Sequence, residues 1–106
     1  MKHFFEVQQL TEQRANTAKA YLEFLRIPAM SAGIYVLAAG TTDLQQPHDE
    51  DEMYYVVRGR ALMRVGSEDR EIGAGSVIFV EAHLEHRFHD IQEELVVLVF
   101  FAPAET

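Results

Sequence analysis

The sequence contains no cysteine, few glycines and prolines, and no long hydrophobic run. Without cysteine, neither disulfide bonds nor thiolate ligands can form, so a bound metal would need imidazole, carboxylate or amide donors. The longest apolar run, Leu95 to Ala102, has eight residues, far fewer than the ~20 that a membrane helix needs. The segment Met1 to Phe5 also lacks the apolar core of a signal peptide. We therefore expect a soluble cytoplasmic protein with no membrane partner.

Positive charge is also scarce. The chain has 9 basic and 17 acidic residues and a formal net charge of −8. Such a charge repels nucleic-acid phosphates and anionic lipid surfaces. The arginines are scattered rather than clustered with aromatic residues, so we expect no nucleic-acid partner. A length of 106 residues fits one domain, residues 1–106. Within it, residues 1–20 are expected to form an N-terminal arm with a short helix carrying Val7, Leu10 and Arg14.

Glycine and proline divide the rest of the chain into short segments, a pattern typical of an all-β sandwich or barrel. The composition of Gly66 to Asp69 is that of a hairpin loop. The strand Leu95 to Ala102 is apolar on both faces, so it is either a central core strand or a core strand whose outer face meets a second subunit. The expected strands are Tyr21 to Ile27, Gly33 to Ala39, Glu52 to Val57, Arg60 to Val65, Glu71 to Ile72, Ser76 to Val80, Glu85 to Phe88 and Leu95 to Ala102.

Metal-ligating residue types gather in two segments. Gln46, His48, Glu50 and Glu52 would share one face of an extended strand, and His86 lies in a second group with His83 and His89. Two imidazoles and a carboxylate, from His48, His86 and Glu52, would form a facial set that leaves coordination positions open. Taken singly, the acidic run is more typical of a solvated loop and each histidine of a packed or surface residue. His3 and His89 are interpreted in that way.

The spacing around the first group resembles the first motif of the cupin family. That motif is Gly, five residues, His, one residue, His, three or four residues, Glu, six residues, Gly. Here Gly40 is followed after five residues by Gln46, then Pro47 and His48, and after three residues by Glu52. A further six residues lead to Gly59. Every spacer fits, and only the first histidine is replaced, by Gln46.

The second group is similar to the second cupin motif, which is Gly, five residues, Pro, one residue, Gly, two residues, His, three residues, Asn. The spacers fit from Gly75 to Asp90, with Glu81 for Pro, His83 for Gly, His86 retained and Asp90 for Asn. The resemblance implies an all-β, cupin-type double-stranded β-helix (jelly-roll barrel) in a small single-domain protein.

The resemblance also implies a ligand set for one divalent metal ion. Carried over by position, the ligands are His48, Glu52 and His86, with Gln46 at the fourth place. Gln46 could be a ligand, a hydrogen-bond partner of a ligand, or a polar residue at the rim. With one imidazole fewer than usual, copper is disfavoured, whereas iron, manganese, zinc and nickel remain open.

Other residues are candidates for contact with a substrate. Glu81 and His83 would lie near the barrel mouth, where they could touch substrate or supply a proton, or simply occupy a tolerant loop. Tyr54 could offer its phenol to a ligand or fill the core. Phe88 would line the pocket with apolar surface.

These features suggest two functions. The first is a metal-dependent enzyme acting on a small organic molecule, of dioxygenase or lyase/isomerase type. The alternative is a non-catalytic module that binds or senses a small ligand. Cupins commonly pair barrels through an outer sheet face, so the resemblance also implies a homodimer.

Overall fold

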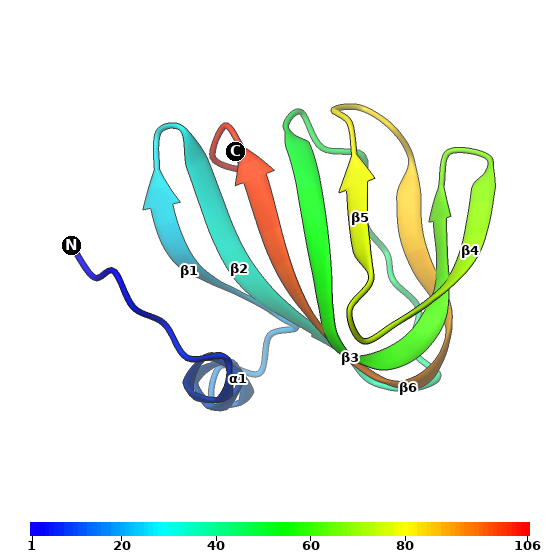
Figure 1. The fold of residues 1–106 in the computed structure, drawn as a ribbon, viewed down its shortest axis with the longest axis horizontal. Coiled ribbons are helices and arrows are strands. Elements are labelled where there is room, and N and C mark those ends of the chain that lie inside the picture. Colours follow the sequence, from blue (N-terminus) through cyan, green and yellow to red (C-terminus); the bar gives the residue numbers. More distant parts are fainter.

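The computed structural model describes all 106 residues and shows one helix and six strands in a single antiparallel sheet. The strand order is β1-β2-β6-β3-β4, and β5 pairs with β3 beside this path. Figure 1 shows how the sheet curves over itself into a barrel, with the helix outside it. The elements are α1 Val7–Ala15, β1 Tyr21–Ile27, β2 Met30–Leu37, β3 Asp51–Val65, β4 Glu68–Gly73, β5 Val77–Val80 and β6 His86–Ala102.

Two long strands, β3 and β6, run through both halves of the barrel. The first part of β3 pairs with β5 and the end of β6, and its second part pairs with β4 and the start of β6. The register between β3 and β6 shifts repeatedly between Val56 and Leu62, so the ribbon bends there. Figure 1 shows that both ends of β3 consequently return to the same end of the barrel.

Gly59 lies in this bend and has φ of +100°, a conformation that side chains with a Cβ rarely adopt. A Cβ at this position would also collide with the carbonyl of Glu94 on β6. The sequence analysis expected strands to end at Gly59, and this was wrong. The glycine allows one strand to bend without breaking. Likewise, the two strands expected within 85–102 are one strand, β6.

The core lies between the curved halves of the sheet. Its largest fully buried side chains include Tyr54, Phe88 and Leu95. Outside the barrel, Leu10 of α1 belongs to a second buried cluster with Ile34 and Val96, and the helix lies against β1 and β2. Val96, on the outer face of β6, is thus buried without a second subunit. No helix is long and apolar enough to cross a membrane, and the cytoplasmic location stays a prediction.

Candidate metal centre

The bend in the sheet brings His86 beside His48 and Glu52, which are four residues apart in the sequence. His48 precedes β3, Glu52 is the second residue of β3, and His86 begins β6. One ligand atom from each residue lies within 4.8 Å of the other two. Glu52 Oε1 is 3.0 Å from His86 Nε2 and 3.8 Å from His48 Nε2. The structure therefore gathers the three residues that the motifs predicted as metal ligands.

The donor atoms of this cluster are buried and poorly satisfied. Both carboxylate oxygens of Glu52 and Nε2 of His86 are buried without a hydrogen-bond partner, since the close approach of the two groups lacks hydrogen-bond alignment. An unsatisfied buried polar group costs about 1–3 kcal/mol. Bonds of ~2.0–2.2 Å from a shared ion would place neighbouring donors ~3–3.5 Å apart. The distance of 3.0 Å between Glu52 and His86 matches this, and His48 lies a little farther out, at 3.8 Å from Glu52. The residues present therefore fit a metal ion.

Both imidazoles direct Nε2 toward Glu52, because Nδ1 faces an acceptor on the other side. His86 Nδ1 donates to the Leu84 carbonyl at 2.8 Å, and His48 Nδ1 lies 3.4 Å from Glu105 Oε2. Contacts of this kind fix the orientation and tautomer of metal-binding histidines. Burial acts to lower the pKa of His86, but the Glu52 carboxylate and the Leu84 carbonyl outweigh it, and the pKa is raised.

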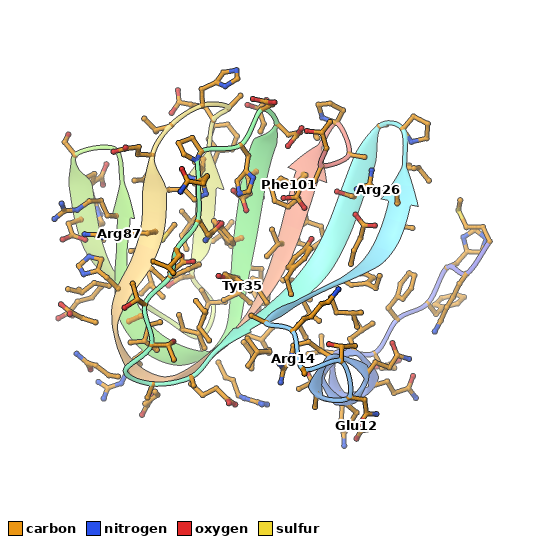
Figure 2. All side chains as sticks on the ribbon, turned by 180° about the vertical axis from the view of Figure 1, so that it is seen from behind. Glu12, Arg14, Arg26, Tyr35, Arg87 and Phe101 are labelled. Atoms are coloured by element: carbon orange, nitrogen blue, oxygen red, sulfur yellow. The ribbon has the colours of Figure 1, made fainter.

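A cavity of about 180 Å³ adjoins the cluster and is bounded by aromatic and polar side chains. Tyr35 and Phe101, labelled in Figure 2, line it from β2 and β6. Tyr54 also lines it and is fully buried, with its hydroxyl donating to Gln45 Oε1 at 3.0 Å. The full lining is Tyr21, Tyr35, Gln45, His48, Glu52, Tyr54, Val99, Phe101 and Glu105.

Three candidate residues lie elsewhere. Gln46 is exposed and borders a second cavity, which Gln45 and His86 also line, and the amide that reaches His48 and Tyr54 belongs to Gln45. Glu81 and His83 are both exposed, and neither lines the cavity beside the cluster. The His83 side chain instead faces Asp49, with Nδ1 3.5 Å from Oδ1.

The expected pocket role of Phe88 also differs in the structure. Phe88 is fully buried and packs edge-on against Tyr54, so it supports the cavity wall from behind. Its backbone N–H donates to Asp43, a buried carboxylate that also accepts from Tyr35 and Gln45. Asp43 thereby fixes two of the lining side chains.

Sequence reasoning missed Tyr21, Tyr35, Asp43, Gln45 and Glu105. Tyr21 and Tyr35 are cross-strand partners on β1 and β2, and strand pairing was not part of the expectation. Gln45 was missed because strand alternation was assumed across a segment that forms no strand. Glu105 comes from the last residues of the chain, where no motif or periodicity marks it.

The buried tyrosines predict a distinct response to alkali. Burial is the main cause that raises the pKa of Tyr21, Tyr35 and Tyr54. A raised pKa in the folded state gives stability that is fully present below the unfolded value of about 10 and is lost as the pH rises through the folded value. Alkali should therefore unfold the protein as these phenols ionise. At pH about 11, phenolate absorbance should correspond to at most one of the four tyrosines while the fold is intact. Two or more phenolates in the folded protein would contradict the burial described.

Comparison with known proteins identifies the family. The cupin domain family matches residues 33–101. An uncharacterised protein of Streptomyces coelicolor is 50% identical over 102 residues, 96% of this chain and 97% of the relative. The structure of TT1209 from Thermus thermophilus has a TM-score of 0.74 at 21% identity, covering 97% of this chain and 99% of that one. DMSP lyase DddQ from Ruegeria pomeroyi has a TM-score of 0.70 at 18% identity, covering 83% and 49%. The expected fold is confirmed, and the chain belongs to the cupin domain family.

Proposed function

We propose that this chain binds one divalent transition metal through His48, Glu52 and His86 and is a metal-dependent enzyme acting on a small organic molecule. The observation that carries the proposal is the convergence of the three residues beside a cavity, with the donor atoms of Glu52 and His86 buried and without hydrogen-bond partners. Two imidazoles and one carboxylate suit iron, manganese, zinc or nickel. The exposed Gln46 is left out of the ligand set.

A divalent ion at these residues would supply a Lewis acid with coordination positions open toward the cavity. The chain itself would bind and orient the substrate. Val99 and Phe101 give the cavity apolar walls that exclude water. Burial raises the pKa of Tyr54, so its hydroxyl stays protonated and can donate a hydrogen bond to a substrate oxygen in place of Gln45. Dioxygenase and lyase/isomerase reactions both suit such a site, and the resemblance to DMSP lyase DddQ supports the second type.

A specific observation favours the alternative, a non-catalytic module that binds a small ligand. The two residues expected to move protons, Glu81 and His83, are exposed and outside the cavity. Among the side chains that do line it, Gln45 and Tyr35 are already engaged in hydrogen bonds. The chain then offers few groups beyond the metal donors for acid–base chemistry.

Metal retention tests the first step of the proposal. The protein is loaded in turn with iron, manganese, zinc and nickel, desalted at neutral pH and analysed for metal. We expect about one equivalent for at least one metal, and its loss in His86→Ala, since two protein ligands remain. The matched control is His89→Ala, because His89 pairs with Asp69 outside the cluster. Retention of none of the four metals by the wild type would reject the metal site.

Turnover separates the enzyme from the binding module. Metal-loaded protein is screened against small acids, amides, phenols and sugars while dioxygen uptake and product formation are followed. An enzyme should turn over at least one compound, and Tyr54→Phe should slow the reaction about tenfold or more without loss of metal. A ligand that raises the melting temperature while no compound is turned over would favour the binding module.

We also propose a homodimer, through a face of the barrel that α1 leaves uncovered. Met53 and Tyr55 on β3 are directly paired with Phe79 and Val77 on β5, and all four side chains are exposed. Met53 and Tyr55 also pair with Phe100 and Leu98 of β6, so the apolar residues of the three strands form one continuous patch. Contiguous exposed apolar surface of this kind is typical of protein–protein contacts. A second copy, joined by a two-fold axis, would cover the patch with itself.

Light scattering at micromolar concentration tests this assembly. The wild type should have twice the chain mass of 12.1 kDa. Phe79→Glu places a charge in the patch and should give a monomer. Leu44→Glu is the matched control, since Leu44 is also apolar and exposed but lies in the segment before β3, and it should leave the dimer intact. A wild type of 12.1 kDa would contradict the proposal.

A further inference from the structure

The cavity beside the metal cluster is lined by acids and phenols and by no lysine or arginine. Glu52 and Glu105 contribute carboxylates to the lining, and the buried carboxylate of Asp43 lies directly behind Tyr35 and Gln45. Arg26 contacts the backbone oxygen of Glu105, but its guanidinium is exposed and paired with Glu23. An anionic ligand would therefore find no lysine or arginine inside the cavity, and the one imidazole there, His48, already faces Glu105.

Tyr21 lines the same cavity and carries a hydrogen-bond donor that its own chain leaves unpaired. Its hydroxyl oxygen is buried and has no partner in the protein. The end of its ring lies over Gly33 of β2, where a Cβ would collide with it, so the absence of a side chain at Gly33 makes this position available. Because burial raises the pKa of Tyr21, the phenol stays protonated. A buried donor left unpaired by its own chain favours a ligand that brings an acceptor.

Glu105 is held at the cavity by the tail that follows β6. Its backbone N–H donates to Ser31 Oγ at 2.9 Å, and its backbone oxygen accepts from Arg26 at 2.6 Å. The carboxylate is half-buried and faces His48. The Glu52 carboxylate lines the same cavity, so a further negative charge brought by a ligand would be repelled at this end.

We propose that the cavity takes a small ligand without negative charge, that Tyr21 binds an acceptor of this ligand, and that Glu105 excludes anions. The size follows from the cavity volume of about 180 Å³, below the ~300–1,000 Å³ typical of drug-sized ligands. The inference rests on the proposed function in that this cavity is taken as the substrate site.

A pair of probes matched in shape tests the charge selection. Lactamide and lactate have the same number of heavy atoms and similar shape, and only lactate is an anion at neutral pH. Binding of each is followed by NMR titration of cavity resonances, on both metal-free and zinc-loaded protein. We expect lactamide to bind about tenfold or more tightly than lactate. Glu105→Gln should strengthen lactate binding and shrink the preference to about threefold or less, with lactamide affinity unchanged.

Two further variants separate the roles of the residues. Tyr21→Phe should weaken lactamide binding by about fivefold through loss of one hydrogen bond and leave the preference over lactate in place. Glu93→Gln is the control, because Glu93 is an exposed carboxylate paired with Arg60, and it should bind both probes as the wild type does. The inference is overturned if lactate binds as tightly as lactamide, if Glu105→Gln leaves the preference unchanged, or if neither probe binds at the highest soluble concentration.

The outcomes also separate this inference from the proposed metal site. If the protein retains no metal but prefers lactamide, the cavity inference stands and the metal centre is rejected. If the protein retains metal and prefers lactate, the metal centre stands and the cavity inference is rejected.

Discussion

The bend of the β3–β6 ribbon is the constraint on which the site depends. His86 pairs with Val65 at one end of β3, and Glu52 lies at the other end, thirteen residues away. A straight strand would separate these positions by ~43 Å, whereas Glu52 and His86 approach to 3.0 Å. The shifts of register between Val56 and Leu62 produce the bend, and Gly59 permits it by its positive φ and its close approach to β6. The bend that closes the barrel therefore also brings the candidate metal ligands together.

The fold provides hydrogen-bond partners for one of the two buried carboxylates near the cavity but not for the other. Asp43 accepts hydrogen bonds from Tyr35, Gln45 and the backbone of Phe88, so its oxygens are satisfied by the protein. Glu52 is equally buried, yet neither of its oxygens has a hydrogen-bond partner. Burial of an unpaired carboxylate is costly, and a cation is the partner that best offsets the cost. The contrast places Asp43 in the organisation of the cavity wall and supports the proposal that Glu52 binds a metal ion.

Much of the fold could be predicted because it is reflected directly in the spacing of the motif residues and in the alternation of apolar and polar residues. The strands around Tyr54 and Val97 follow from apolar patterns, and the intervals between His48, Glu52 and His86 follow from the motifs. Other features depend on tertiary context. A glycine can either end a strand or let the strand bend. At Gly59 the strand bends because its backbone packs closely against Glu94 of β6, and the sequence alone does not show this contact. The segment before β3 has no strand alternation, so Gln45 rather than Gln46 reaches the cavity. The dimer, the metal and the cytoplasmic location stay predictions.

The residues proposed to bind the metal lie inside the segment that matches the family, whereas the residues proposed to select the ligand lie outside it. Residues 33–101 match the cupin domain, and His48, Glu52 and His86 all fall within that range. Tyr21 and Glu105 fall outside it, on β1 and on the tail after β6, yet both line the cavity. Tyr21 and Glu105 are also separate from the bent β3–β6 ribbon, which carries Glu52 and His86. Ligand specificity in this protein should accordingly be sought in the contacts of Tyr21 and Glu105 rather than in the motifs.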